Sequence, residues 1–300
     1  MKDVFYSTIL RSFGFLVTHL PSGFRTRLLN ALSSAIFFLN RYHRRIVLTN
    51  LEFAFGSELT PRERNEIARR TYRNFVHYLA HFLMRFGKPM EVIRRSVTIK
   101  NEEIFTTALA SGKPVIVITA HYGNWELIGP MIGSFYAPIT AVGKKVKSET
   151  ISRELFSHRV MGDVEVLESK GAIKGLMKAM KAGRVLGLVV DQNTRKKESV
   201  VVDFFGRRAR HIDSAARLAR RTGAIIVPVF VHSEDHQHFI MTFHEPILTA
   251  RTDDEQSDIL ASVQAQASIT EQVIRQKPDE YFWFHKRFKA EYPQLYTKKR

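Results

Sequence analysis

Apolar residues follow two different rhythms along the chain, and the change falls near residue 90. Up to that point they recur at helical spacing, without an alternating strand pattern. Thr60-Pro61-Arg62-Glu63 contains a capping box with proline at the first helical position, so we expect a helix to begin there. It should end before Gly87 and Pro89. One apolar face of this helix is formed by Ile67, Thr71, Phe75, Tyr78, Leu79, Phe82 and Phe86.

Beyond residue 91, short β-branched runs alternate with helical segments. The expected strands cover residues 115–120, 139–142, 164–167, 185–190 and 200–205, and Ile225–Val231 and Phe239–Phe243 form an antiparallel pair. The expected helices cover residues 125–135, 149–160 (capped by Ser148), 173–181, 213–221 and 255–276. This alternation predicts an α/β fold with a mostly parallel central sheet flanked by helices. We expect residues 1–90 to form an N-terminal helical region and residues 91–300 an α/β domain.

Polar residues follow two of these strands directly. Val115–Ala120 is an almost wholly apolar run that suits a strand covered on both faces, and it delivers His121 to its carboxyl end. Val185–Val190 is followed in the same way by Asp191-Gln192-Asn193. Ligands of open α/β sheets bind beyond the carboxyl ends of the strands, so we expect one crevice lined by both segments. Asp and Asn are also ordinary turn residues, which is the alternative interpretation of the second segment.

His121 and Glu126 form a candidate catalytic dyad. Gly123 and Asn124 permit a tight turn, and the helical turn that follows brings Glu126 back beside His121. A carboxylate next to an imidazole fixes its tautomer and raises its basicity, as a general base for a hydroxyl requires. A histidine followed by a glutamate is common without any catalytic role, so the position at a strand end is what favours catalysis.

The net charge and the absence of cysteine limit which partners and which kinds of site are possible. Lys and Arg number 46 against 29 Asp and Glu, a net charge of +17, which implies an anionic partner: nucleic acid, a phosphorylated small molecule or a membrane surface. The absence of cysteine excludes disulfides, thiolate nucleophiles and cysteine-based metal sites. Basic residues that cluster around the predicted crevice suit a phosphate-bearing ligand. They are Lys144, Lys145, Lys147, Arg159, Arg195, Lys196, Lys197, Arg207, Arg208 and Arg210.

Several reaction classes lack their sequence signatures. The chain has no Gly-x-Ser-x-Gly elbow, no P-loop and no dinucleotide-binding fingerprint. His77 and His81 lie four residues apart, but Tyr78 stands where a zinc-protease motif has glutamate, so we interpret both as the polar fringe of a helix. We therefore expect no metal and no cofactor. A dyad without a protein nucleophile points to direct attack by a substrate hydroxyl on an activated acyl group.

The N-terminal region contains two apolar segments. Val4–Leu20 is interrupted by Arg11, and Leu28–Leu39 is shorter than the ~20 apolar residues of a spanning helix. No small-residue cleavage site follows the first segment, which argues against a signal peptide. Flanking arginines favour segments that lie in, or insert into, one leaflet of an anionic membrane. A helical subdomain packed on the core explains the same pattern equally well.

The stretch His121-Tyr122-Gly123-Asn124-Trp125-Glu126 resembles the His-x4-Asp/Glu motif of the glycerolipid acyltransferase superfamily. Its form is typical of the bacterial late acyltransferases of lipid A biosynthesis. Further similarities follow in order over nearly the whole chain, and one departure is Asn193, where an Asp is usual. They are Asn50-Leu51, Arg159, Asp191-Gln192-Asn193, Phe204-Phe205-Gly206, Arg221-Thr222-Gly223-Ala224 with Val227-Pro228, and Tyr281 to Lys289.

The resemblance implies an acyltransferase that moves a fatty acyl chain from acyl–acyl carrier protein to a hydroxyl of a lipid A precursor. His121 would be the general base and Glu126 would orient it. Arg159 would bind a lipid phosphate or sugar headgroup, with Asp191 and Asn124 supporting the site. Trp283, His285 and Arg287 would brace its wall or meet the headgroup. The basic surface would meet the acidic carrier protein and anionic lipid at the cytoplasmic face of the bacterial inner membrane.

Three other interpretations remain. An acyltransferase with another lipid acceptor, such as lysophosphatidate or a glycosylated phosphoinositide, would share the motif and differ in its pocket. A nucleic-acid-binding protein would explain the net charge, but the basic residues are spread along the chain and are not interleaved with aromatic residues. A catalytically inactive membrane-associated scaffold is the third.

Overall fold

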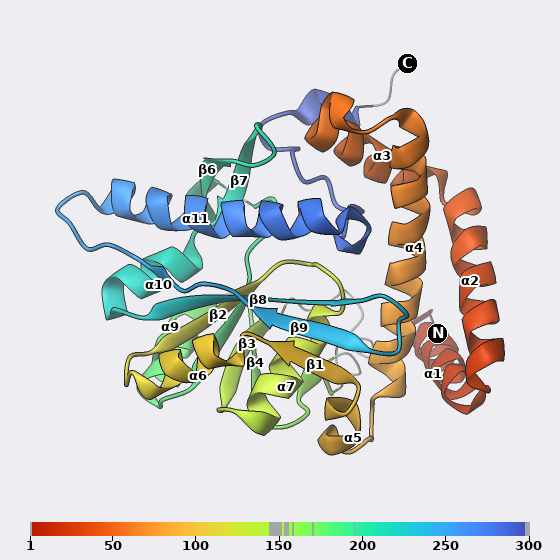
Figure 1. Cartoon of the computed structure of the whole chain (residues 1–300), viewed down its shortest axis with the longest axis horizontal. Coiled ribbons are helices and arrows are strands. Elements are labelled where there is room, and N and C mark those ends of the chain that lie inside the picture. The colour runs from red at the N-terminus through yellow and green to blue at the C-terminus, as the bar shows by residue number, and fades with distance from the viewer. Residues whose placement is uncertain are drawn as a thin grey trace.

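The computed structural model describes residues 2–143, 152, 156–157, 159–169, 171–194 and 196–297, without the side chains of residues 2–7. Several helices precede the first strand: α1 (Lys2–His19), α2 (Ser22–Leu39), α3 (Arg41–Phe55), α4 (Pro61–Met84) and α5 (Met90–Arg94). The predicted capping box is confirmed, because the Thr60 side chain accepts from the Glu63 N–H while the Glu63 carboxylate accepts from the Thr60 N–H. α4 lies between the sheet and α2 (Figure 1).

The main sheet is mostly parallel, as predicted. Its strands run in the order β1-β9-β8-β2-β5-β3-β4, and β10 also pairs with β8. Among the described residues of this sheet, only the β8–β9 and β8–β10 pairs are antiparallel. The bounds are β1 (Val97–Lys100), β2 (Val115–Thr119), β3 (Ile139–Gly143), β4 (Val164–Glu168), β5 (Val185–Val189), β8 (Ile225–Ser233), β9 (Phe239–Phe243) and β10 (Ile247–Leu248).

Helices cover both faces of this sheet, which explains the continuous apolar strands. Val115 and Val117 of β2 pack in one core cluster with α6 (Glu102–Ala110) and α7 (Ile128–Phe135). Ile116 and Ile118 pack in another with α9 (Ala172–Lys181) and α10 (Ser214–Thr222). Successive side chains of a strand point to opposite faces, so a strand that is covered twice needs apolar residues at every position.

A further core lies above the sheet and joins the two ends of the chain. It contains residues of α3 and α4 together with Trp283, Phe288 and α11 (Glu255–Gln276). Two strands, β6 (Ser199–Asp203) and β7 (Arg208–Ile212), form a separate two-stranded sheet and contribute Val202 and Ala209 to this core. The expected strand at 200–205 therefore exists, but it lies outside the main sheet.

Other boundaries differ from the predictions for local reasons. The helix expected from residue 125 begins as a 3-10 turn at Trp125–Leu127 and becomes α7 at Ile128. β1, α6 and β7 were not predicted, because each is short and its apolar pattern is weak. The expected cap at Ser148 and most of the helix expected over 149–160 lie outside the described residues.

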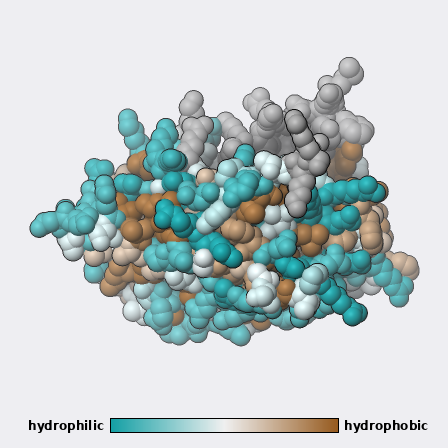
Figure 2. All heavy atoms as spheres, turned by 90° about the horizontal axis from the view of Figure 1, so that it is seen from above, coloured by the Kyte–Doolittle hydropathy of each residue, from teal (hydrophilic) through white to brown (hydrophobic). Residues whose placement is uncertain are grey.

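The N-terminal helices expose apolar side chains. Phe15 of α1 is 67% exposed, and Phe24 and Leu39 of α2 are 65% and 82% exposed. Among the described helices, none is both long enough and apolar enough to cross a bilayer. On the face shown in Figure 2, hydrophobic residues form several separate clusters among hydrophilic ones.

Candidate active site

His121 and Asp191 meet because their strands are neighbours. β2 and β5 are adjacent and parallel, with Thr119 opposite Val189. His121 lies two residues beyond the first of these and Asp191 two residues beyond the second, so both emerge at the same edge of the sheet. The two strand ends therefore bring these side chains together, as expected.

The hydrogen bonds of His121 assign a different role to each of its two ring nitrogens. Nδ1 lies 2.8 Å from Oδ1 of Asp191, and Nε2 lies 3.2 Å from the side-chain nitrogen of Gln192. A carboxylate accepts and an amide nitrogen donates, so this network puts the proton on Nδ1 and leaves a lone pair on Nε2. The imidazole side chain is 21% exposed, whereas that of Asp191 is fully buried. Nε2 is thus the nitrogen able to accept a proton from a substrate.

The charge of Asp191 is fixed by its surroundings. Burial alone would raise its pKa, but His121, followed by His285 and Arg287, holds the pKa of the carboxyl well below its usual range. An ionised Asp191 stabilises a positive charge on the imidazole, as the orienting carboxylate of a general base does.

Glu126 has a different partner from the one expected. Its carboxylate forms two hydrogen bonds with the guanidinium of Arg159, including one of 3.0 Å from Nε, and none with His121 among the described residues. Burial favours the neutral acid, yet Arg159 lowers the pKa of Glu126 below its ordinary value. The spacing placed a carboxylate near His121 but did not reveal Asp191, which is distant in sequence and is the group that contacts the imidazole. The catalytic role assigned to Glu126 stays a prediction.

Arg85 is a site residue that the sequence reasoning missed. Its guanidinium is fully buried, donates to the backbone carbonyl of Glu126 and lies 4.8 Å over the ring of Phe82. Burial lowers its pKa to about 10, which leaves the group charged at neutral pH. The sequence contained a signal for it, because residue 85 directly follows α4 in line with the apolar face of the helix, where an arginine needs a buried partner.

The turn between His121 and Glu126 is held by close backbone contacts. Gly123 has a φ of +55°, and a Cβ there would lie 1.6 Å from the carbonyl oxygen of Val231. Its N–H donates to the carbonyl of Glu280, and the His121 carbonyl accepts from the N–H of Phe282. Only glycine fits at position 123. The hydrogen bonds to Glu280 and Phe282 let the C-terminal segment fix the position of the turn that carries His121.

Asn124 also holds this turn. Its N–H donates to the carbonyl of Val231, and its side-chain nitrogen lies 3.0 Å from Nδ1 of His81. Burial lowers the pKa of His81 to about 3, so the ring is neutral and accepts this hydrogen bond. Its neighbour His77, expected on a polar fringe, is instead buried, with its ring stacked on that of His236. No group of metal-ligating side chains occurs among the residues the structure describes.

The C-terminal residues proposed to bind substrate lie behind the site. Trp283 is fully buried, with its indole N–H donating to the carbonyl of Pro278. Arg287 is also fully buried, and its guanidinium donates to the carbonyl of Arg210 and to Nδ1 of His211. Of the two roles expected for these side chains, their burial favours bracing the wall, and contact with a headgroup stays a prediction.

Two further residues complete this wall. The ring of His285 lies 3.0 Å from the carbonyl of Phe282, and burial lowers its pKa to about 4. Asn50 of α3, which belongs to the N-terminal similarity, donates to the carbonyls of Trp283 and His285 at 2.8 Å each. The N-terminal helices therefore hold the C-terminal signature in place.

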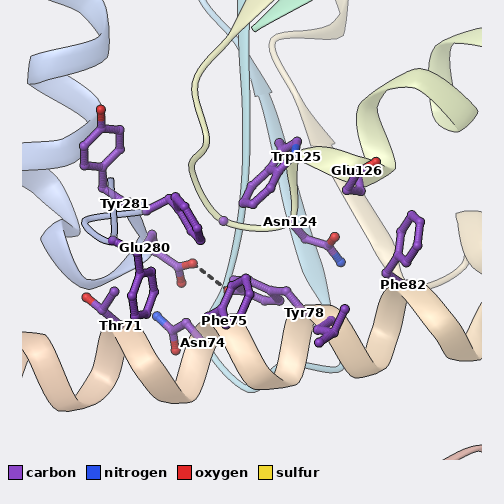
Figure 3. Close-up of a pocket in the computed structure, with 14 residues that line it drawn as sticks. Thr71, Asn74, Phe75, Tyr78, Phe82, Asn124, Trp125, Glu126, Glu280 and Tyr281 are labelled. Atoms are coloured by element: carbon purple, nitrogen blue, oxygen red, sulfur yellow. Dashed lines mark hydrogen bonds between the residues drawn. The ribbon is translucent and has the colours of Figure 1, made fainter. Parts of the chain in front are cut away.

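A pocket of about 180 Å³ opens beside the turn (Figure 3). Phe75, Tyr78 and Phe82 reach it from α4, and Trp125 and Glu126 reach it from the turn (Figure 3). Its lining is mainly apolar and aromatic, as suits a hydrocarbon chain. The rings of Trp125 and Phe282, which line it, contact His121 with centroids 5.1 and 6.1 Å away. The remaining lining residues are Thr71, Asn74, Leu79, Gly123, Asn124, Glu280, Tyr281, Phe282 and Phe284.

The predicted basic ring extends beyond the described residues. Lys144, Lys145, Lys147 and Arg195 lie outside the described residues. Arg159 is described and is engaged with Glu126, while Arg210 forms an ion pair with Glu291. The binding of a phosphate by this ring stays a prediction.

Residues 5–290 match the profile of the family described as "Bacterial lipid A biosynthesis acyltransferase". The chain belongs to this family. A lipid A biosynthesis lauroyltransferase of Escherichia coli K12, a similar protein, is 24% identical over 92% of this chain and 88% of its own length. The membership accounts for the ordered similarities between Asn50 and Lys289, and the recognition made from the sequence is confirmed.

Other similar proteins are named for other lipids. A phosphatidylinositol mannoside acyltransferase of Mycolicibacterium smegmatis is 28% identical, over 48% of this chain. The match spans 46% of that protein, so the chain covers about half the length of this relative. The crystal structure of a 1-acyl-sn-glycerophosphate acyltransferase from Thermotoga maritima covers 82% of this chain and 96% of its own, with 15% identity and a TM-score of 0.34.

Proposed function

We propose that this protein transfers a fatty acyl chain from acyl–acyl carrier protein to a hydroxyl of a lipid A precursor. The observation that carries the proposal is the unprotonated Nε2 of His121, which faces only the amide of Gln192 at 3.2 Å, on a ring that is oriented by Asp191 and contacts two residues of the aromatic pocket. Membership of the lipid A acyltransferase family supports the substrate class.

The chemistry follows from the tautomer. Nε2 of His121 takes the proton of the acceptor hydroxyl, and the oxygen attacks the carbonyl carbon of the thioester. The tetrahedral intermediate collapses with breakage of the C–S bond, and the thiolate leaves with the proton from the imidazolium. Asp191 holds Nδ1 throughout and stabilises the imidazolium. The products are an ester on the acceptor and the thiol of the carrier protein.

Each part of the substrate has a matching region. The aromatic pocket between α4 and the turn would hold the acyl chain. The Glu126–Arg159 pair would keep one guanidinium at the edge of the site for a phosphate or sugar headgroup. The net charge of +17 suits both an acidic carrier protein and an anionic membrane. With exposed apolar residues on α1 and α2, this charge supports a location at the cytoplasmic face of the bacterial inner membrane.

A second acceptor class has its own support. The phosphatidylinositol mannoside acyltransferase relatives favour a glycosylated phospholipid as acceptor, with the same use of His121. The two candidates differ only in which lipid carries the hydroxyl.

The test is product analysis with labelled acyl–acyl carrier protein, supplied with either a lipid A precursor or a mannosylated phosphoinositide. The proposal expects label on the lipid A precursor, and no transfer by His121→Ala. Transfer only to the phosphoinositide would replace the first acceptor by the second. An active protein that uses acyl–coenzyme A but not the carrier-bound acyl chain would contradict the donor.

A further inference from the structure

A second, polar cleft lies on the face of α4 that points away from the aromatic pocket. It has a volume of about 330 Å³ and lies between α2 and α4. Its α2 wall consists of Asn30, Ser33, Ser34, Phe37 and Phe38, and its α4 wall of Glu66, Arg69, Arg70 and Arg73. Neither the family motif nor the proposed acyl transfer uses this cleft.

Helical spacing builds the cleft. Positions 66, 69, 70 and 73 share one face of α4, and positions 30, 33, 34, 37 and 38 share one face of α2. The two serines are small, so they leave space between the helices. Their hydroxyls donate to the carbonyl of Asn30 at 2.8 and 2.9 Å, which holds the serine side chains against their own helix.

The charge of the cleft is positive and only partly neutralised. Arg70 forms an ion pair with Glu66, the one carboxylate in the lining. Among the described residues, Arg69 and Arg73 form no ion pair with a carboxylate. The guanidinium of Arg69 lies 5.2 Å over the rings of both Phe37 and Phe38, which fixes it at the cleft. These two guanidiniums match a phosphate group, and the short serine side chains opposite them leave room for it.

Exposed apolar side chains of α2 lie next to the arginines of the cleft. Phe38 lines the cleft and is 53% exposed, and Leu39 next to it is largely exposed. Phe24 and Leu28 extend the exposed apolar surface along α2. A soluble phosphate would satisfy the arginines and leave these side chains in water. A molecule that joins a phosphate to hydrocarbon chains satisfies both.

We propose that the cleft between α2 and α4 binds the phosphate headgroup of an anionic glycerophospholipid in the membrane surface, with the acyl chains of the lipid along the exposed apolar residues of α2. The bound lipid is neither donor nor acceptor. It anchors one face of α4 at the bilayer while the opposite face lines the aromatic pocket, so it sets where the pocket opens relative to the membrane. The proposal stands independently of the acyl-transfer chemistry.

The first experiment compares binding of the full chain to phosphatidylcholine vesicles with and without phosphatidylglycerol. Arg69→Gln/Arg73→Gln should lower the partition onto the anionic vesicles about tenfold or more, since each basic residue near such a surface contributes about 1 kcal/mol. The matched control is Arg221→Gln/Arg251→Gln, which removes the same charge from exposed positions outside the cleft. It should change the partition less than about twofold. Equal losses in both variants would overturn the proposal.

A second variant separates a bound headgroup from diffuse attraction. Ser34→Gln fills the cleft without changing the charge. It should weaken the binding of monomeric short-chain phosphatidylglycerol, measured by calorimetry, about tenfold, while glycerol phosphate alone should bind weakly to either protein. An unchanged affinity in Ser34→Gln would refute the site, and so would glycerol phosphate binding as tightly as the lipid. Circular dichroism checks the fold of each variant, and the Ser34 arm decides if the arginine variant does not fold.

Discussion

His121 and Asp191 lie 70 residues apart in sequence and 2.8 Å apart between Nδ1 and Oδ1. Each follows a paired residue of two adjacent parallel strands by the same two positions. The sheet therefore sets the geometry of the pair, and rigid strands hold it more closely than a loop would. Asp191 is therefore the carboxylate that contacts the imidazole, and the orienting role assigned to Glu126 stays a prediction.

Asp191→Asn tests this orientation. The amide keeps the size of the side chain but can donate to Nδ1, which shifts the imidazole proton to Nε2 and blocks proton acceptance there. We expect kcat/KM for acyl transfer to fall about 10³-fold to 10⁴-fold. Steady-state kinetics on purified protein provide the measurement, with the exposed Asp253→Asn as control. A loss below about tenfold would show that Asp191 does not orient the base.

The pairing of Glu126 with Arg159 predicts that their variants are coupled. Either Glu126→Gln or Arg159→Gln breaks the same clamp, so the double variant should cost far less than the sum of the two. We expect a coupling of about 1–3 kcal/mol in the activation free energy from kcat/KM. Glu126→Gln combined with Arg251→Gln is the control cycle, and it should be additive. Additivity at Glu126 and Arg159 would mean that the clamp has no role in the reaction.

Gly123 is expected to be essential for the close packing of the His121–Glu126 turn against β8. Gly123→Ala puts a Cβ 1.6 Å from the Val231 carbonyl oxygen, whereas Gly112, at a φ of +71°, has nothing within 4 Å of such an atom. Gly112→Ala should therefore cost only the backbone strain of about 1 kcal/mol. Gly123→Ala should cost more than about 3 kcal/mol in the free energy of unfolding, measured with urea. Equal costs would show that the turn moves freely.

Glu280 predicts a pH dependence of stability. Its carboxyl is buried and bonded to the hydroxyl of Tyr78 (Figure 3), and burial raises its pKa to about 7. The folded state therefore retains a proton on Glu280 that the unfolded state loses. The contribution of this proton to the free energy of unfolding is complete below the unfolded-state pKa of 4.5, and it is lost as the pH rises through about 7. The loss is about 3 kcal/mol.

Glu280→Gln has no such proton and should be less sensitive to pH over this range. Urea unfolding at about pH 5 and about pH 8 measures the difference between the two proteins. If the wild type and Glu280→Gln show the same pH slope, Glu280 is ionised in the folded protein throughout.

Much of the fold follows from local sequence. The buried strands are continuous apolar runs, and α4 is marked at its start by a capping box, so both were predicted. β6 and β7 were harder, because whether a strand joins the main sheet depends on contacts with α11 and the C-terminal segment, not on its own pattern.

The candidate site also combines residues that local sequence predicts with contacts that only the fold determines. His121 and Asp191 were found separately, because a polar residue after a buried strand is a local signal. Their contact was not found, because it depends on the order of β2 and β5 in the sheet. For Arg287 the sequence left two roles open, bracing the wall or meeting a headgroup, because the partners that allow an arginine to be buried, here the Arg210 carbonyl and His211, are supplied only by the folded chain.

The most direct test of the account is the rate of acyl transfer by purified His121→Ala, with acyl–acyl carrier protein as donor and a lipid A precursor as acceptor. The account predicts that kcat/KM falls at least about 10³-fold while the melting temperature stays near that of the wild type, because in the proposed mechanism Nε2 removes the proton of the acceptor hydroxyl. A folded His121→Ala protein that transfers the acyl chain at a rate within a few-fold of the wild type would contradict it.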